Sequence, residues 1–589
     1  MKVSDFIFDY IASLGVKHVF YLPGGGAMHL DDSLGHHEGI IPICMLHEQP
    51  CSIAAEAYAR ISENYGVCVV TSGPGATNAI TGLAGAWLDA TPVIFLSGQA
   101  KRADLVNGQG IRQFGIQEIN IVDIVKPITK YAVQLQEPQD ILYELEKATA
   151  LSKEGKPGPV WLDIPLDIQA SQVEPSELRH YEERQTEYLC SDENVLETIK
   201  LFNQAERPVV LLGNGIRLAK AIPEMNELIE KLHVPVMTTW NGVDLIEDEN
   251  PLFFGRPGAV GHRHSNFIQQ NADFVLTIGT RLNLLSTGYD FDSFLRNAKH
   301  VMVEIDDNEM KKCSVHPTLA IHADAKSFFK KMLVHQEKIE DKPRNEWWKY
   351  CYDIKKKYPL FIKEQTPEGE GINTYSLVDV LTTKMTSEDV FQFSSSGTGV
   401  DISMYGFRIK KGQRAFLTKG LASMGFDMSA CIGSCLASNK RRTVCITGDG
   451  GFMMNVQELA TLHSLNLPIK LFILCNEGYG MIYNSQSGNF KRLTGCTRES
   501  GLGMPDLKEI VESFKVKCFN IDNESELGSK IDEVLAYDGP AVCTIKVYIG
   551  QKILPRQTNY MKPDGQMASR PLEDMSPLLE RDEFNSNML

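Results

Sequence analysis

The stretch Thr443-Val444-Cys445-Ile446-Thr447-Gly448-Asp449-Gly450-Gly451-Phe452 decides the fold of this chain when it is taken together with Lys470-Leu471-Phe472-Ile473-Leu474-Cys475-Asn476-Glu477-Gly478. Each stretch opens with a short apolar run that predicts a buried strand, and residues 456–464 between them predict a helix. The pattern is one strand–helix–strand unit, so Asp449 and Asn476 close two neighbouring parallel strands. Ligands bind at such strand ends in open parallel sheets.

The residues at these strand ends indicate a diphosphate bridged by a metal ion. Gly450 and Gly451 allow backbone N–H groups to approach a phosphate at a helix start. A hard divalent cation that keeps phosphate ligands needs only one or two side-chain oxygens, which Asp449 and Asn476 offer. The alternative is a plain strand–helix turn in which Asp449 caps the helix. The strand context on both sides favours the metal site.

The length and composition indicate an acidic protein with several domains. The 589 residues exceed the size of one hydrophobic core, and the net charge of −16 argues against a nucleic-acid partner. No long apolar run occurs, so we expect no transmembrane helix and no membrane partner, and Asp5 and Asp9 argue against a signal peptide. The 13 cysteines are scattered and several lie in apolar runs, which favours reduced thiols and a cytoplasmic location.

Alternating strand and helix patterns predict an α/β fold of three doubly wound parallel-sheet domains. We assign residues 1–175 to the first domain, 190–335 to the central domain and 370–550 to the third, which carries the opening motif. The charged, aperiodic residues 175–195 are predicted to be a linker. Residues 551–589 form a proline-interrupted tail with few strand or helix signals.

Three such blocks with the metal motif in the last one resemble the acetohydroxyacid (acetolactate) synthase branch of the thiamine-diphosphate-dependent enzymes, over essentially the whole chain. The resemblance implies that the first domain binds the pyrimidine of the cofactor and the third binds its diphosphate. It also implies Mg²⁺ held by the side chains of Asp449 and Asn476 and by the backbone carbonyl of Gly478.

The string Leu46-His47-Glu48-Gln49 matches the proton-transfer site of that family. By resemblance, Glu48 shares a proton with N1′ of the aminopyrimidine, which lets the 4′-amino group remove the C2 proton of the thiazolium. A surface glutamate favoured by the helix dipole is the alternative. The flanking residues match the family as a string and therefore favour the catalytic role.

Other strings match positions around the cofactor. Residues 70–78 lie beside the pyrimidine in the family, and Gln117 matches a substrate contact, with Gln99 a weaker candidate. In residues 419–426, Met424 matches the bulky residue that bends the cofactor, whereas a core methionine is the alternative. The candidate cofactor-binding residues are Gly73, Asn78, Ala422, Met424, Gly450, Gly451, Tyr479, Gly480 and Met481.

One further turn, Ser396-Gly397-Thr398-Gly399-Val400-Asp401, resembles a diphosphate-binding turn of the family but carries Val400 and Asp401 where the synthases have a Gln-His pair. A carboxylate beside a diphosphate is unfavourable unless it turns away. We therefore exclude Asp401 from the site.

The central domain resembles the part of the synthases that holds a non-redox FAD. The matching strings, in chain order, are Leu212-Gly213-Asn214-Gly215, Thr238-Thr239-Trp240-Asn241-Gly242, Gly279-Thr280-Arg281-Leu282, Glu304-Ile305-Asp306 and Ala323-Asp324-Ala325. Gly255-Arg256-Pro257-Gly258 departs from the usual Gly-Met-His-Gly, and Leu282-Asn283 replaces an aromatic–acid pair. FAD, ADP or no nucleotide at all are the alternatives that the sequence leaves open.

The implied reaction starts from a 2-oxo acid donor, with pyruvate as our hypothesis. Residues 105–120 contain no adjacent histidine pair of the kind that simple pyruvate decarboxylases use, which favours carboligation. Ser485 stands where a synthase has the tryptophan that selects a 2-oxo acid acceptor, and His29 replaces a proline near the substrate. A larger acceptor, such as a ketosugar, is our hypothesis. The alternatives are a 2-oxo acid decarboxylase, a C–C hydrolase or lyase acting on a dione, and a non-catalytic relative.

The family builds each active site from two chains. Glu48 of one subunit is implied to reach the cofactor anchored by Asp449 of another. The resemblance therefore implies a homodimer or homotetramer with active sites at the subunit interface.

Overall fold

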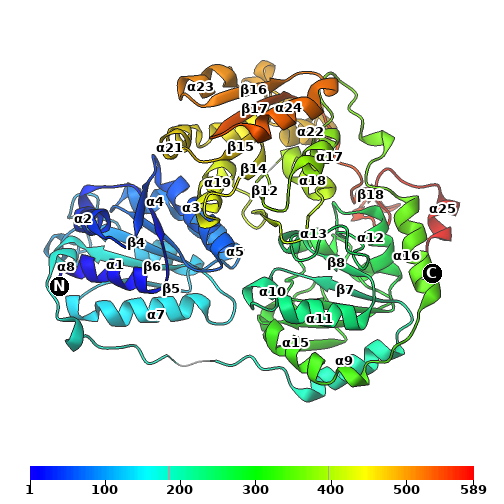
Figure 1. The fold of residues 1–589 in the computed structure, drawn as a ribbon, viewed down its shortest axis with the longest axis horizontal. Coiled ribbons are helices and arrows are strands. Elements are labelled where there is room, and N and C mark those ends of the chain that lie inside the picture. Colours follow the sequence, from blue (N-terminus) through cyan, green and yellow to red (C-terminus); the bar gives the residue numbers. More distant parts are fainter. Residues whose placement is uncertain (184–185, 396) are drawn as a thin grey trace.

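The structure is a computed structural model of the 589-residue chain, and it describes residues 1–183, 186–395 and 397–589. Within those residues it contains three parallel sheets flanked by helices, together with one small hairpin (Figure 1). The prediction of an α/β fold with three doubly wound domains is confirmed. Arg184 and Gln185 of the predicted linker, and Ser396 of the predicted diphosphate turn, lie outside the described residues.

The first domain is a six-stranded parallel sheet in the order β2-β1-β3-β4-β6-β5. Its strands are β1 His18–Tyr21, β2 Ile41–Cys44, β3 Gly66–Val70, β4 Val93–Gln99, β5 Tyr131–Gln134 and β6 Val160–Pro165. Its helices are α1 Val3–Ser13, α2 Met28–His36, α3 Glu48–Ser62, α4 Pro74–Asn78, α5 Ile80–Leu88, α6 Ile121–Val125, α7 Ile141–Lys153 and α8 Leu166–Ala170. The strand order reverses between β1 and β3, where the backbone N–H of Gly26 donates to Thr71 Oγ1 at 3.0 Å.

The central domain has five parallel strands in the order β11-β10-β9-β7-β8. These are β7 Pro208–Leu212, β8 Val236–Thr238, β9 Phe274–Ile278, β10 Lys299–Glu304 and β11 Leu319–His322. The helices are α9 Asp192–Gln204, α10 Gly215–Leu218, α11 Ile222–Leu232, α12 Arg263–Asn271, α13 Leu284–Thr287, α14 Asp307–Met310, α15 Ala325–Val334 and, beyond the sheet, α16 Asn345–Lys357. The order reverses between β7 and β9, where the Gly215 N–H donates to the Gly279 carbonyl at 2.9 Å.

The third domain has six strands in the order β13-β12-β14-β15-β17-β16, which repeats the order of the first sheet. The strands are β12 Val390–Gln392, β13 Arg414–Phe416, β14 Thr443–Gly448, β15 Ile469–Cys475, β16 Lys517–Ile521 and β17 Ala541–Lys546. The helices are α17 Thr374–Lys384, α18 Gly397–Gly406, α19 Phe426–Ala437, α20 Asp449–Met453, α21 Leu459–Leu465, α22 Gly480–Asn489, α23 Leu507–Ser513 and α24 Leu527–Ala536. The order reverses between β12 and β14. Asp449, the residue that follows β14, therefore lies at the switch point of this sheet.

The first and third domains are joined through α3 and α19, which lie side by side in Figure 1. A Cβ atom on Gly433 of α19 would lie 2.1 Å from the Ala54 carbonyl oxygen of α3, so only glycine allows the two backbones to approach this closely. Ile53 and Ala57 of α3 pack with Phe426 and Ala430 of α19 in one buried cluster. The two domains therefore share a continuous core.

The C-terminal tail is more ordered than the sequence indicated. It forms β18 Asn559–Met561, β19 Met567–Ser569 and α25 Arg581–Ser586. The prolines hid this order, because they removed the periodicity that marks longer elements. Buried Asn266 of α12 donates to the Leu572 carbonyl at 2.8 Å, and Asn271 of the same helix donates to the Asn587 carbonyl at 2.9 Å. The tail is thus fastened to the central domain.

Among the residues that the structure describes, none of the helices combines the length and the apolar character that crossing a bilayer requires.

Buried His300 predicts a pH-dependent contribution to stability. Its Nε2 lies 3.0 Å from Thr277 Oγ1, and burial lowers its pKa to about 4 from the usual 6.5. As pH falls below about 6.5 the unfolded chain takes up a proton that folded His300 does not, so this residue's contribution to stability decreases toward about pH 4.

We expect His300→Gln to be less stable than the natural chain near neutral pH. The difference in the free energy of unfolding should narrow by about 2 kcal/mol on moving from about pH 6.5 to about pH 5, because only the natural chain titrates here. Urea unfolding at the two pH values measures the difference, and all other groups titrate alike in both proteins. A difference that stays constant with pH would contradict the expectation.

Candidate functional site

Asp449 and Asn476 are brought together at the ends of β14 and β15, which pair in parallel. Asp449 Oδ2 accepts the backbone N–H groups of Asn476 at 3.0 Å and Glu477 at 2.8 Å, and Oδ1 accepts that of Gly450 at 2.7 Å. Asn476 Oδ1 accepts the N–H of Gly478 at 3.0 Å. The carboxylate, the amide oxygen and the Gly478 backbone thus occupy one small region of the sheet edge.

The chemistry of this region fits a divalent cation. Asp449 is 2% exposed, and burial raises its pKa to about 6 even though the neighbouring backbone N–H groups act in the opposite direction. A buried carboxylate in this state is stabilised as an anion by a nearby positive charge. Oxygen atoms from Asp449, Asn476 and the Gly478 carbonyl are the ligand type that Mg²⁺ prefers.

Gly450, Tyr479 and Met424 meet beside Asp449. A Cβ atom on Gly450 would lie 2.4 Å from the Tyr479 ring and 3.3 Å from Met424 Cε. Gly480 begins α22 directly after Tyr479, and a Cβ there would lie 3.2 Å from Asn476 Nδ2. The structure therefore gathers the predicted residues of the third domain around one point.

The segment leading to Met424 and the helix after Asp449 complete this region. Ala422 has a φ of +57°, a strained value for a residue other than glycine, and Gly425 has a φ of +89°. Gly451 lies in the first turn of α20, where a Cβ would be 3.3 Å from Asp427 Oδ2. These turns expose backbone groups of the kind that hold a pyrimidine or a diphosphate.

Ser395 was not singled out from the sequence, yet it lies at the switch point beside Asp449. Its backbone N–H donates to Asp427 Oδ1 at 2.6 Å, and its side chain also acts to lower the pKa of the Asp427 carboxyl, which burial raises. A Cβ on Gly397 or on Gly448 would meet open space. The open space at these two glycines fits a phosphate group.

Glu48 begins α3 and is 8% exposed. Asn78, at the end of α4, donates its Nδ2 to Glu48 Oε2 at 3.0 Å. His47 caps the helix by accepting the Gln49 N–H at 3.1 Å. The structure therefore brings Glu48 and Asn78 together, and a Cβ on Gly75 would lie 3.6 Å from Glu48 Oε1.

Gly73 and Gln117 also meet. A Cβ on Gly73 would lie 2.8 Å from the Gln117 carbonyl oxygen, and Gly73 has a φ of +61°. The Gln117 side chain is exposed. Gln99, by contrast, is buried inside the first sheet and donates to Asp163 Oδ2 at 3.0 Å and to the Ile119 carbonyl at 2.9 Å. Ile119 lies two residues after Gln117, so Gln99 holds the segment that carries Gln117.

The residues predicted to face the acceptor are exposed or half-buried in this chain. Met481 and Ser485 lie on α22, and both are exposed. His29 lies in the first turn of α2 and is half-buried. Asp401, which the sequence analysis excluded from the site, forms a 2.9 Å ion pair with Lys419.

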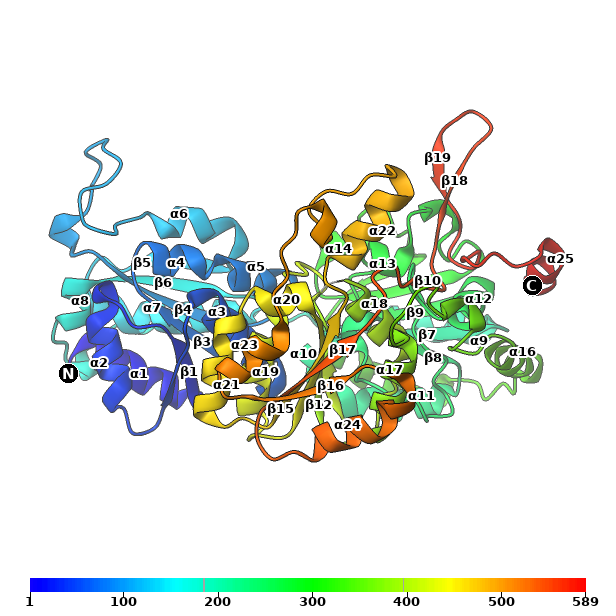
Figure 2. The same ribbon diagram turned by 90° about the horizontal axis from the view of Figure 1, so that it is seen from above.

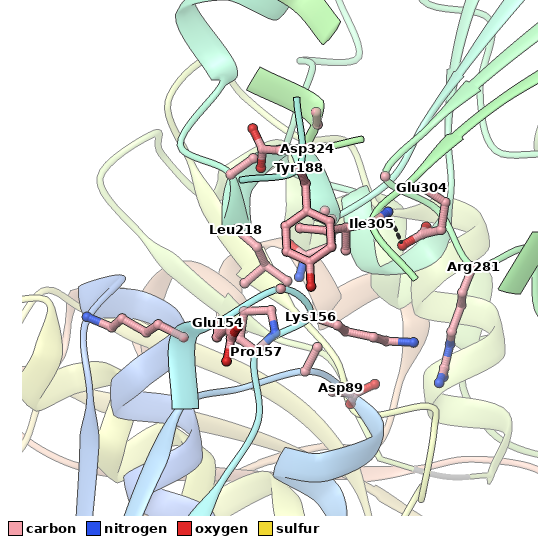
Figure 3. Close-up of a pocket in the computed structure, with 18 of the residues that line it drawn as sticks. Asp89, Glu154, Lys156, Pro157, Tyr188, Leu218, Arg281, Glu304, Ile305 and Asp324 are labelled. Carbon is pink, nitrogen blue, oxygen red and sulfur yellow. Dashed lines mark hydrogen bonds between the residues drawn. The ribbon is translucent and has the colours of Figure 1, made fainter. Parts of the chain in front are cut away.

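A cavity of about 810 Å³ lies between the first and central domains (Figure 3). Its size is within the range of small-molecule and cofactor sites. Residues from all five strings that the sequence singled out in the central domain line it, including Asn214, Asn241, Thr280, Glu304 and Asp324. Since these residues follow the ends of parallel strands, the cavity occupies the switch point of the central sheet.

The other wall of the cavity was not predicted. Figure 3 shows Tyr188 of the linker and Lys156 of the first domain extending into it opposite Glu304. Lys156 Nζ forms ion pairs with Asp306 at 3.2 Å and Glu309 at 2.8 Å. Strand periodicity could not reveal these residues, because neither ends a strand of the central sheet.

The departures from the family pattern have structural explanations. Arg256 is 1% exposed and points away from the cavity, where it pairs with Asp248 at 2.7 Å and donates to the Phe407 carbonyl at 3.1 Å. It therefore joins the central and third domains. Asn283 caps α13 by accepting the Ser286 N–H, and both Leu282 and Asn283 line the cavity.

Comparison with known proteins adds three family matches. Residues 1–124 match the thiamine pyrophosphate enzyme N-terminal TPP binding domain, residues 195–332 match the central domain of these enzymes, and residues 398–545 match their C-terminal TPP binding domain. Each match includes strands of a different sheet.

Individual relatives resemble the chain over nearly its whole length. It is 28% identical to the acetolactate synthase isozyme 1 large subunit of Escherichia coli, over 94% of this chain and 95% of that protein. It is 32% identical to probable acetolactate synthase large subunits of Methanococcus aeolicus, over 89% and 88%, and of Methanocaldococcus jannaschii, over 93% and 92%.

Close packing at Gly450 predicts a local effect that needs no bound ligand. In Gly450→Ala the added methyl group must displace Tyr479, so we expect a loss of about 1–3 kcal/mol in stability. Gly488→Ala in α22 is the matched control, because a Cβ there meets open space within a helix. Thermal unfolding of both variants measures the effect. Equal midpoints for the two variants would contradict the packing described.

Proposed function

The chain belongs to the thiamine pyrophosphate enzyme family, and from this premise we propose that it is a decarboxylating carboligase that transfers a two-carbon unit from pyruvate to a carbonyl acceptor. Its three family domains and its likeness to acetolactate synthase large subunits make it a thiamine-diphosphate-dependent, acetolactate synthase-like enzyme. The single observation that supports catalysis most directly is the combination of Glu48 paired with Asn78 and Asp449 paired with the end of β15.

Each residue contributes a defined task in this proposal. When bound, thiamine diphosphate supplies a nucleophilic carbon and an electron sink for the loss of CO₂. Asp449, Asn476 and the Gly478 carbonyl would hold Mg²⁺. Glu48 would hold a proton for the pyrimidine, while the hydrogen bond from Asn78 orients the Glu48 carboxyl. Met424 would pack against the cofactor and help to position it.

The acceptor is proposed to be larger than a 2-oxo acid, with a phosphate-bearing ketosugar as the favoured class. Support comes from Ser485, whose small side chain leaves the exposed side of α22 open. Lys491 and Arg492 follow this helix, and neither forms an ion pair with the described residues. Two cationic side chains just after α22 that form no ion pair within the described part of the chain, on a protein of net charge −16, favour an anionic acceptor.

We further propose a homodimer or homotetramer that shares its active sites between chains. Leu46 lies two residues before Glu48, Met454 follows α20, and Met481 lies on α22. All three are substantially exposed in the single chain. Apolar side chains around both halves of the site support a partner subunit that covers them.

The central cavity is proposed to hold FAD. A dinucleotide is supported by the residues that line the cavity. They come from five strand ends and include Tyr188 of the linker and the cations Lys156 and Arg281. We expect the purified protein to show a flavin absorbance spectrum that is lost on denaturation and removal of small molecules. Mass spectrometry of the released material checks its identity. Recovery of ADP, or of no nucleotide, would contradict FAD without affecting the reaction proposed.

Product analysis tests the reaction itself. With pyruvate and a panel of aldehydes, 2-oxo acids and ketosugar nucleotides, we expect mass spectrometry to detect a product two carbons longer than a large acceptor. Efficient formation of acetolactate from pyruvate alone would contradict the large acceptor. Acetaldehyde and CO₂ as the only products with every acceptor would contradict carboligation and favour a simple decarboxylase. Cleavage of a dione would favour the hydrolase or lyase alternative.

Replacement of Glu48 tests the proton role. Glu48→Gln can still accept the hydrogen bond from Asn78, but its amide cannot transfer a proton. We therefore expect turnover to fall by about 10²-fold or more. Glu38→Gln, at an exposed position, is the matched control and should retain activity. Initial rates of CO₂ release at saturating cofactor provide the measurement. Full turnover in Glu48→Gln would remove this residue from the mechanism.

A further inference from the structure

Two segments project from opposite ends of the molecule on the same side (Figure 2). One is the tail hairpin, formed by β18 and β19 and defined here as residues 559–569. The other is the β4–α6 loop, defined here as residues 105–117, which joins the first sheet to α6. Apart from Gln117 at the end of the loop, neither segment belongs to the site described above.

The tail hairpin presents an uncovered apolar face. Met561 lies directly opposite Met567 in the antiparallel register, so their side chains share one face, and they are 65% and 63% exposed. On the other face, Arg570 covers the ring of Tyr560 at 5.1 Å. The turn is well formed, with Gly565 at a φ of +83°. The methionine pair is therefore displayed by an ordered element.

The base of the hairpin fixes its position on the central domain. Arg556 and Ser576 exchange backbone hydrogen bonds of 3.1 and 2.8 Å, and the Gln557 N–H donates to the Ala259 carbonyl at 2.7 Å. An isolated two-stranded hairpin is marginally stable in water. A hairpin anchored this firmly, with two exposed methionines at its far end, has the character of a contact element.

The β4–α6 loop is also ordered and also displays apolar side chains. The Glu118 carboxylate accepts the backbone N–H groups of Val106 at 2.6 Å, Phe114 at 2.9 Å and Gly115 at 3.0 Å. The loop is thus held in one conformation while Phe114 and Ile116 point outward, the latter 90% exposed. The exposure of apolar side chains to water is unfavourable, which favours a partner that covers this surface.

We propose that the tail hairpin of one subunit packs Met561 and Met567 against Phe114 and Ile116 of a second copy of this chain. This inference rests on the homodimer proposed above. A two-fold axis perpendicular to the plane of Figure 2 turns the upward direction downward and exchanges the two ends of the molecule. It therefore brings each hairpin to the β4–α6 loop of the other copy, forming the same contact twice.

The contact would reach the acceptor side of the active site. Gln117 ends the β4–α6 loop, and its backbone lies against Gly73 in the turn after β3. A hairpin seated on Phe114 and Ile116 therefore forms a wall close to the predicted substrate contact. The tail of one subunit would in this way shape the acceptor entrance built on the first domain of the other.

Cross-linking of the full-length protein tests the contact. In the double variant Met561→Cys/Phe114→Cys, we expect mild oxidation to produce a disulfide-linked dimer on non-reducing gels. Within one chain the two segments lie at opposite ends of the molecule, so the disulfide must join two chains (Figure 2). The wild type, with its exposed Cys44 and Cys313, gives the background. Met561→Cys/Val334→Cys is the matched control, because Val334 on α15 is 67% exposed, against 57% for Phe114.

A second pair of variants tests the energetic contribution. Met561→Glu/Met567→Glu should raise the dimer dissociation constant by about tenfold or more, since two buried methionines would become two buried charges. Lys562→Glu, in the same hairpin at its turn, should leave the constant unchanged. Mass photometry over a dilution series measures both.

The outcomes separate this inference from the proposed reaction. A dimer that shows no specific cross-link and an unchanged dissociation constant overturns the contact alone. Equal cross-linking in Met561→Cys/Val334→Cys also overturns it. A specific cross-link in a protein that makes no carboligation product supports the contact and overturns only the reaction, because disulfide formation needs no catalysis.

Discussion

The carboxylate of Asp449 links the ends of two neighbouring parallel strands through hydrogen bonds, and the geometry of the third domain depends on these bonds. By accepting N–H groups from Asn476 and Glu477, it fixes where β15 ends relative to β14. That position sets the start of α22 and, through the Tyr479 ring, the distance to Gly450 and Met424. A single buried carboxylate therefore organises the backbone while offering oxygen atoms to a cation.

The same arrangement recurs in each domain. All three sheets reverse their strand order next to the strand that comes first in the chain, which is where ligands bind in open parallel sheets. In the first sheet Gly73 approaches Gln117, in the central sheet Gly215 approaches Gly279, and in the third Ser395 and Thr447 both bind the Asp427 carboxylate. Topology thus places polar residues of distant sequence in common regions, and the residues then decide which ligand each region fits.

The strand ends could be predicted from the sequence, and the contacts that side chains make across domains could not. Short apolar runs with polar ends indicated the strands before Asp449 and Asn476 and, with the alternating helices, the fold, whereas the strings that line the central cavity came from the family resemblance. Side chains that act across domains carried no such signal: Tyr188 lies in an aperiodic linker, and Lys156 precedes a strand of another sheet. Gln99 matched the family by string, yet the buried Asp163 engages it. The tail hairpin was hidden because its strands are only three residues long.

The close packing of α3 on α19 has a mechanical consequence for an assembly of two chains. Helix α3 begins at Glu48, and α19 begins two residues after Met424. The contact of Gly433 with the Ala54 carbonyl prevents the helices from sliding or separating without breaking the shared core. In the proposed dimer these ends serve different active sites. A shift that follows substrate entry at one centre would then be transmitted as a rigid displacement to the other, and such a link favours centres that work in alternation.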